Sequence, residues 1–188
     1  MSFVNFSTKE IHLKILYFGA GLGGKTTNMQ YIFYSQQNQK DLEIFNSENE
    51  RTLFFDFLPV SYEPYKDYKM ILNLYTIPGQ NINQELRDLV FQGLDGVIFV
   101  VDSQKKQFKE NEKSFHELKE IIQKELLDIP IVVQFNKRDL KDIYSVLKLK
   151  KGLMLEEYPQ IEAIANKGSG VFETLNSMVN IIKENIRM

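Results

Sequence analysis

The 188-residue sequence contains no cysteine, which excludes disulfides and a thiolate metal site. It also lacks an excess of charge of either sign, because 23 Lys and Arg face 25 Asp and Glu and the net charge is −2. This balance gives no electrostatic reason to expect a nucleic-acid partner or a membrane surface. We expect the short basic clusters at residues 105–106 and 148–151 to be solvated faces.

Long hydrophobic runs are missing as well. The run at residues 97–101 is typical of the longest ones, far short of the ~20 residues that span a bilayer. The first residues lack the charged and apolar regions of a signal peptide, Ser2 stands where N-myristoylation requires glycine, and residues 185–188 offer no cysteine for prenylation. We therefore expect a cytoplasmic protein with no direct lipid anchor.

The length and the 43% hydrophobic content predict one globular domain over residues 1–188. Strands alternate with helices after an early hairpin, which predicts an α/β fold with a mostly parallel six-stranded sheet, one antiparallel edge hairpin and helices on both faces. Apolar runs predict strands at residues 11–18, 96–102, 131–135 and 161–165, and aromatic runs at 51–57 and 68–75 predict the hairpin, with its turn region at Pro59 and Pro64. Apolar spacing predicts helices from Lys25 onward and at residues 85–92, 115–126 and 171–186, with partial helix in 140–158.

One glycine-rich stretch joins a predicted strand to a predicted helix. Gly19, Gly24, Lys25 and Thr26 fit the pattern G-x-x-x-x-G-K-[ST], in which backbone N–H groups and a helix N-terminus face a polyphosphate. Lys25 would reach the β- and γ-phosphates, and the Thr26 hydroxyl would hold Mg²⁺. The residues expected to contact the phosphates are Gly19, Gly21, Leu22, Gly23, Gly24, Lys25, Thr26 and Thr27.

Two other interpretations of this stretch are open at this point. Gly19, Gly21 and Gly24 also spell the dinucleotide fingerprint G-x-G-x-x-G. That site does not require the Lys25-Thr26 pair, and no acidic residue ends a clear second strand about 20 residues on. A glycine-rich loop without any ligand is the other alternative.

A second motif follows the predicted strand at 131–135. Asn136, Lys137 and Asp139 match N-K-x-D, the motif of guanine-nucleotide-binding proteins. A carboxylate at Asp139 can accept hydrogen bonds from guanine N1–H and the 2-amino group, a donor pair that adenine lacks. A carboxylate facing the wrong base would stay unpaired, which provides selectivity. Asn136 would support neighbouring loops, and the stem of Lys137 would pack on the base.

With these motifs the sequence resembles small Ras-like GTPases, and more narrowly the bacterial MglA group, the mutual gliding-motility GTPases that set cell polarity. The resemblance implies a Ras-like P-loop GTPase fold with GTP or GDP and Mg²⁺ as ligands. It covers nearly the whole chain except residues 140–160 and rests on residues 1–6, 19–28, 51–59, 75–80, 102–104, 136–140 and 170–175.

The resemblance also implies roles for residues in two rearrangeable segments. Thr52 is similar to the threonine that senses Mg²⁺ and the γ-phosphate, and Gln80, beside Gly79, is similar to the glutamine that orients the attacking water. Arg51 resembles the arginine that the MglA group supplies in cis to neutralise transition-state charge, a contribution of roughly 10³ to 10⁵ in rate. On the residues alone, we would expect Arg51 to be an ordinary exposed arginine at a strand edge.

The chain departs from the broader Ras pattern at two places. Thr76 stands where most relatives have the aspartate of D-x-x-G, a feature that the MglA group shares, so other carboxylates or Thr76 itself would support the Mg²⁺ shell. The guanine-contacting S-A-K motif is replaced by Ile-Ala-Asn at residues 164–166, where the Ala165 N–H would serve.

The resemblance implies a GTP-dependent switch that hydrolyses GTP slowly alone and faster with a partner. In the MglA group this partner is MglB, a small roadblock-type activator, and the effectors act in cell polarity or motility. Such partners would recruit the protein to a cell pole. A nucleotide-binding scaffold that turns nothing over is the alternative from a different class.

Overall fold

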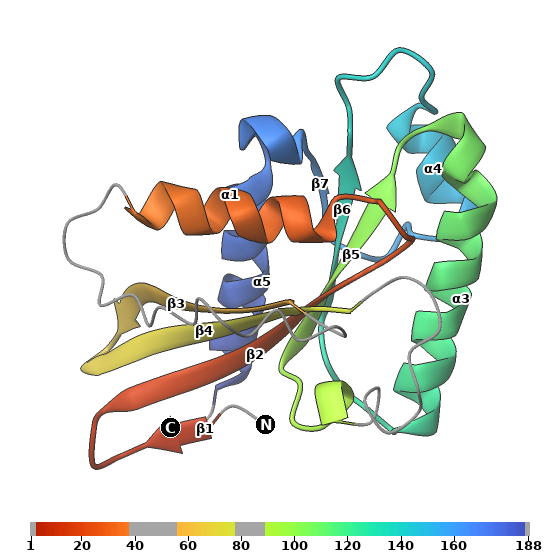
Figure 1. Cartoon of the computed structure of the whole chain (residues 1–188). Helices are drawn as coiled ribbons and strands as arrows, with labels where there is room; N and C mark the ends of the chain where they lie inside the picture. Colours follow the sequence, from red (N-terminus) through yellow and green to blue (C-terminus); the bar gives the residue numbers. More distant parts are fainter. Residues whose placement is uncertain (1–2, 38–55, 78–88, 187–188) are drawn as a thin grey trace.

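The computed structural model describes residues 3–37, 56–77 and 89–186 (Figure 1). Within these ranges seven strands form one sheet in the order β3-β4-β2-β5-β6-β7, with β1 paired to β2. The strands are β1 Phe3–Asn5, β2 Glu10–Phe18, β3 Asp56–Tyr65, β4 Tyr68–Thr76, β5 Gly96–Asp102, β6 Ile131–Asn136 and β7 Gln160–Glu162. The helices are α1 Lys25–Gln37, α3 Phe108–Lys124, α4 Val146–Gly152 and α5 Val171–Asn185, with 3-10 turns η1 Lys105–Gln107 and η2 Ala165–Lys167; residues 89–91 are also helical.

The predicted fold class is confirmed. Strands β4, β2, β5, β6 and β7 run parallel, and β3 pairs antiparallel with β4 at one edge. The additional, seventh strand is β1, which pairs antiparallel with the first part of β2 through the register Val4↔Ile11. Because β5 pairs with β2 only from Ile15 onward, β1 occupies the space beside the beginning of β2.

Two hydrophobic cores cover the two faces of the sheet. Helices α1 and α5 lie on one face, and α3, α4 and the helical residues 89–91 lie on the other (Figure 1). Alternate residues of β2 divide between the two cores: Ile15 and Tyr17 belong to the α1 and α5 side, Leu16 and Phe18 to the other. This double cover explains why the central strands are continuously apolar.

The hairpin differs from the prediction in its turn. Pro59 and Pro64, which we expected at the turn, lie inside β3, and the turn comes later, at Lys66 and Asp67. Proline lacks a backbone N–H, but β3 pairs within the described chain only with β4, so an edge strand accommodates both prolines. Residues 51–55, the first part of the predicted strand, lie outside the described residues.

In the last third of the chain, the structure differs from the prediction in the bounds of one strand and one helix. The strand expected at residues 161–165 is β7, which ends at Glu162, and Ala165 belongs to the 3-10 turn η2. In residues 140–158 the helix is short: α4 begins after Ser145, whose hydroxyl accepts a hydrogen bond from the Lys148 N–H.

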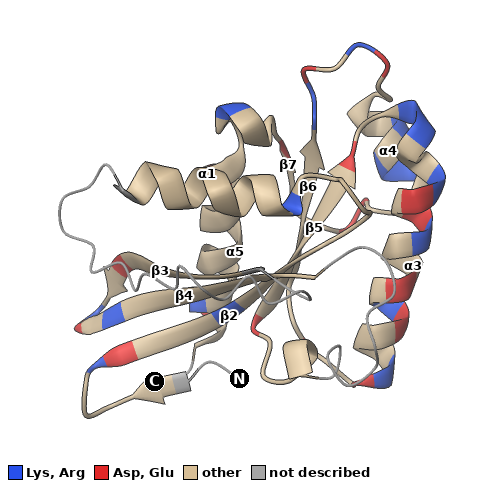
Figure 2. Ribbon diagram, viewed as in Figure 1, with Lys and Arg blue, Asp and Glu red and all other residues tan. Residues whose placement is uncertain are grey.

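Many of the charged residues belong to α3 and α4 (Figure 2). Lysines and glutamates alternate along α3, while α4 carries the basic residues of the 148–151 cluster, of which Lys148 and Lys151 are exposed. In the other cluster, Lys105 pairs with Asp142 across 2.7 Å. No helix in the described ranges is both long and apolar enough to cross a membrane.

Candidate functional site

Three neighbouring parallel strands, β2, β5 and β6, end at one edge of the sheet, and β2 and β6 lead into the two motifs. Strand β2 leads from Phe18 into the glycine-rich loop, and Asp102 and Asn136 end β5 and β6 opposite each other in register. The carboxyl ends of parallel strands are where ligands bind in open α/β sheets. The two motifs, more than 100 residues apart in the sequence, therefore meet at this edge.

Two glycines of the loop (residues 19–24, called the phosphate loop below) have positions that no side chain can occupy. Gly19 has φ +142°, and a Cβ there would lie 2.3 Å from the Val100 carbonyl oxygen. Gly24 has φ +102°, and a Cβ there would lie 2.2 Å from Nδ2 of Asn136. The loop thus packs its backbone directly on β5 and on the N-K-x-D motif. Leu22, in contrast, is 87% exposed at φ 60°.

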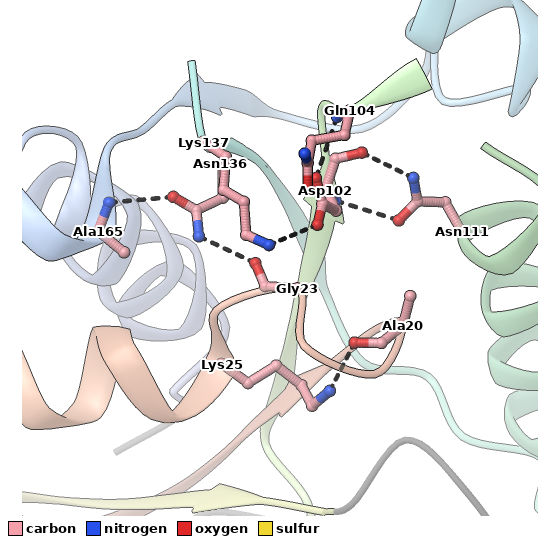
Figure 3. A network of polar contacts seen from close by, with 9 residues as sticks. All are labelled: Ala20, Gly23, Lys25, Asp102, Gln104, Asn111, Asn136, Lys137 and Ala165. Atoms are coloured by element: carbon pink, nitrogen blue, oxygen red, sulfur yellow. Dashed lines mark hydrogen bonds and ion pairs between the residues drawn. The ribbon is translucent and has the colours of Figure 1, made fainter. Parts of the chain in front are cut away.

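Lys25 begins α1 and turns its side chain back toward the phosphate loop. Its Nζ donates a hydrogen bond to the Gly19 carbonyl oxygen at 2.8 Å. It donates another to the Ala20 carbonyl oxygen at 2.9 Å (Figure 3). The residue is only 7% exposed, so its ammonium is held in place. The first N–H groups of α1 have no acceptor within the helix and form its positive end beside the same loop, an arrangement suited to an anion.

Asn136 links the phosphate loop to the segment after β7. Its Nδ2 donates to the Gly23 carbonyl oxygen at 2.9 Å, and its Oδ1 accepts a hydrogen bond from the Ala165 N–H at 3.0 Å (Figure 3). Asn136 is 2% exposed, and the buried amide supports loops on either side of β6, as the sequence predicts. Ala165 is also buried, and its predicted contact with guanine stays a prediction.

Lys137 is held by a buried carboxylate that the motifs do not include. The Lys137 Nζ lies 2.6 Å from Oδ2 of Asp102, which is 0% exposed, and the Gln104 N–H donates to Oδ1 of the same carboxylate (Figure 3). Asn111 of α3 fixes the Asp102 backbone, donating to its carbonyl oxygen and accepting from its N–H. Lys137 itself has φ 63°, so its backbone turns sharply after β6.

The remaining residues of the N-K-x-D motif are anchored to the neighbouring segment. Arg138 pairs with Glu162 of β7 at 2.8 Å, and its Nη1 donates to the Tyr144 carbonyl oxygen. The Asp139 carboxylate lies 3.3 Å from Nζ of Lys167, which is mostly exposed, while the Asp139 side chain is 22% exposed. Asp139 is thus an accessible acceptor on a braced loop.

The structure brings the phosphate-loop residues, Asn136, Lys137 and Ala165 together around one edge. Thr76, at the position of the missing aspartate, ends β4 and is 3% exposed. The residues predicted to act in catalysis and in the two rearrangeable segments, Arg51, Thr52, Gly79 and Gln80, lie outside the described residues, so their roles stay predictions. Thr26 and Thr27 lie in the first turn of α1, as the pattern requires.

Some polar residues near this edge escaped sequence reasoning. Asp102 and Gln134 are both fully buried in strands, and Asn28 is fully buried in α1. A signal did exist for two of them, because a Gln inside the apolar run of β6 and an Asp ending the apolar run of β5 both interrupt hydrophobic patterns. Buried polar side chains need partners, and such interruptions mark positions where partners exist.

Two comparisons with known proteins give matches over nearly the whole chain. The model of the ADP-ribosylation factor family (Arf) matches residues 1–186. The chain is 41% identical over 187 residues to the mutual gliding-motility protein MglA of Myxococcus xanthus, an alignment that covers 97% of this chain and 96% of that protein.

Proposed function

We propose a function from one established premise: the chain belongs to the ADP-ribosylation factor family of Ras-like small GTPases. It is therefore a molecular switch that binds guanine nucleotides and hydrolyses GTP to GDP and phosphate. Members of this class change shape when loss of the γ-phosphate releases two segments near the nucleotide. We take residues 1–188 as a single GTPase domain.

The phosphates lie, in this proposal, in the phosphate loop and at the start of α1. The residues present fit phosphate groups. Gly19 and Gly24 have no Cβ, which lets the loop adopt a conformation that side chains would prevent, and the Lys25 side chain is turned toward the loop. Successive N–H groups of the loop and of the first helical turn would donate to phosphate oxygens. The base lies near Asp139, with the stem of Lys137 against the ring and the Asp102 carboxylate holding that lysine in place.

Magnesium and the hydrolytic groups complete the proposal. Thr26 and Thr52 would hold Mg²⁺, which supplies positive charge beside the phosphate oxygens. Gln80 would orient the attacking water, and Arg51 would neutralise charge that develops on the phosphates. These assignments follow from the family resemblance together with the position of Thr26 in the first turn of α1.

We propose that the biological output is control of cell polarity or of gliding or pilus motility. The name of the M. xanthus relative supports gliding motility, and the other two follow from the resemblance to the MglA group. An MglB-like roadblock activator would accelerate hydrolysis, and polarity or motility effectors would bind the GTP state. Strand β3 supports a partner surface, because it lies at the edge of the described sheet and Phe57 on it is 47% exposed. The protein would be cytoplasmic and reach a cell pole through these partners.

The observation that carries the proposal is the Asn136 bridge, which joins the loop expected to bind phosphate to the segment expected to bind the base. Nucleotide exchange with fluorescent GDP tests it directly. We expect GDP binding that Asp139→Ala abolishes and no binding of NAD. GDP binding that survives Asp139→Ala, or NAD binding in its place, would contradict this proposal.

Single-turnover hydrolysis separates a switch from a passive scaffold. Arg51→Ala and Gln80→Leu should each lower the rate of GTP hydrolysis, while GDP affinity changes little because neither residue contacts the base or the β-phosphate in this proposal. Rates unchanged in both variants would leave only a nucleotide-binding scaffold. A mixture with a roadblock-type protein should raise turnover of the natural protein and have no effect on Arg51→Ala.

A further inference from the structure

Three polar side chains lie deep in the hydrophobic core between the sheet and the helices α1 and α5. They are Asn28 of α1, Gln134 of β6 and Thr174 of α5, and each is 0% exposed. Their neighbours along the chain, including Met29 and Leu175, belong to the hydrophobic core on this face of the sheet. Burial of amides and hydroxyls is costly unless each finds a partner, so the arrangement requires an explanation.

The three side chains form one continuous chain of hydrogen bonds. Asn28 and Gln134 exchange two reciprocal bonds of 2.8 and 2.9 Å between their amides. Gln134 Nε2 also donates to Oγ1 of Thr174 at 2.9 Å. At one end Asn28 Nδ2 donates to the Gly24 carbonyl oxygen at 2.9 Å, and at the other the Thr174 hydroxyl donates to the Gly170 carbonyl oxygen at 2.5 Å. Every N–H and O–H donor of the three side chains is therefore used.

The two ends of this chain lie at the two halves of the proposed nucleotide site. Gly24 is the last glycine of the phosphate loop and directly precedes Lys25. Gly170 ends the segment 163–170 (called the base loop below), which contains Ala165, and a Cβ on Gly170 would lie 2.2 Å from the Glu162 carbonyl oxygen. The base loop is thus closed tightly against β7 at the point where the hydrogen-bond chain ends.

The buried series of hydrogen bonds is a second link beside the Asn136 bridge. Gln134 and Asn136 are two residues apart in β6, so their side chains point to the same face of the sheet. Asn136 joins Gly23 to Ala165. The hydrogen bonds through Gln134 join Gly24 to Gly170. Two separate polar links therefore connect the same two loops, and only the Asn136 link belongs to the N-K-x-D motif.

We propose that Asn28, Gln134 and Thr174 are positioning residues that hold the phosphate loop and the base loop at a fixed spacing, so that both ends of a guanine nucleotide are bound at once. This inference rests on the function proposed above. Apolar side chains could fill the same volume but would let α1 and α5 shift against β6. Hydrogen bonds are directional and fix the two loops before the ligand arrives, which reduces the cost of binding and slows release.

A matched pair at one position tests the idea. Thr174→Val keeps the shape and removes the hydroxyl, which leaves one Gln134 N–H without its acceptor. The Gly170 carbonyl oxygen loses the bond from the hydroxyl but still accepts from the Thr174 backbone N–H. We expect release of fluorescent GDP to be about 10-fold faster, which corresponds to ~1.4 kcal/mol. Thr174→Ser keeps the hydroxyl and should release GDP within about twofold of the natural protein.

The ratio of GDP to GMP affinity distinguishes positioning from a general loss of stability. GMP carries the base but lacks the β-phosphate, so it gains less from a fixed spacing of the two loops. Thr174→Val should therefore lower the affinity for GDP more than the affinity for GMP. Val179→Ala, in the same helix and core, is a matched control: it creates a cavity and lowers thermal stability but leaves the affinity ratio and the release rate unchanged.

The combined variant Asn28→Leu, Gln134→Leu, Thr174→Val tests the inference even if Thr174→Val fails to fold. Removing all the partners together leaves few unpaired groups, so the variant should fold, and its GDP release should still be fast. A folded triple variant with the natural release rate, or a Thr174→Val variant that loses only thermal stability, overturns the inference. Absence of GDP binding by the natural protein would instead refute the proposed function, so the two failures are distinguishable.

Discussion

The contact between Lys137 and Asp102 permits a quantitative prediction, because its two partners differ in burial. Asp102 is fully buried, whereas the Lys137 side chain is 27% exposed, and 2.6 Å separates Nζ from Oδ2. Lys137→Met keeps the stem of the side chain and leaves a buried carboxylate without its countercharge. Removing one partner of a buried pair costs about 3–5 kcal/mol of unfolding free energy.

The opposite change should cost less. In Asp102→Asn the ammonium of Lys137 can turn toward water, and the side-chain oxygen can still accept from the Gln104 N–H. The loss is then that of one hydrogen bond to a charged group, about 1.5–3 kcal/mol. We therefore expect Lys137→Met to destabilise the fold more than Asp102→Asn. The double variant should cost less than the sum of the two, because it contains no unpaired buried charge.

Chemical denaturation measures these differences. Bound nucleotide adds RT ln(1 + [L]/Kd) to stability, so unfolding should be followed at several GDP concentrations and compared at equal saturation. Equal costs for the two single variants, with a strictly additive double variant, would refute the reasoning. That result would mean that the carboxylate and the ammonium do not depend on each other.

Three further changes give expected outcomes. Gly19→Ala should lower the free energy of unfolding by about 2–4 kcal/mol and abolish GDP binding, since its Cβ would meet the Val100 carbonyl oxygen. Gly21→Ala is the control: a Cβ at Gly21 meets nothing within 4 Å, so the melting temperature should not change. Tyr17→Phe should raise unfolding free energy by about 1–2 kcal/mol in denaturant titrations, because the buried Tyr17 hydroxyl has no hydrogen-bond partner in the described part of the chain; a loss of stability would contradict this. Burial raises the pKa of Asp95 above 3.8 although the Lys14 N–H bonds its carboxylate, so the folded state binds this proton more tightly. This contribution to stability is fully present below pH 3.8 and is lost as pH rises through the raised pKa; Asp95→Asn should remove that part of the pH dependence, and an unchanged profile would argue against it.

Much of the fold can be predicted from local patterns in the sequence. The apolar runs of β5 and β6 are long enough to identify buried strands, and the glycines before Lys25 mark a sharp strand-to-helix turn. Both motifs also follow strands, so their meeting at one edge follows from the parallel order of the sheet. A short stretch of sequence contains the residues that determine each of these features.

Other features depend on neighbours that no short window contains. Pro59 and Pro64 indicate a turn when read alone, and their place inside β3 depends on that strand having a described neighbour on one side only. Similarly, the partners of Gln134 come from α1 and α5, 106 and 40 residues away in the chain. The importance of such a residue becomes visible only when three elements are packed together.

The short strand β1 has a consequence for how the protein behaves at high concentration. Strand β2 pairs with β4 along its length on one side, and on the other side β1 covers residues 10–12 while β5 covers residues 15–18. A strand with unpaired backbone groups can recruit a strand from another molecule and start aggregation. Three residues, Phe3–Asn5, thus protect the strand that leads into the phosphate loop from pairing with a second copy of the chain.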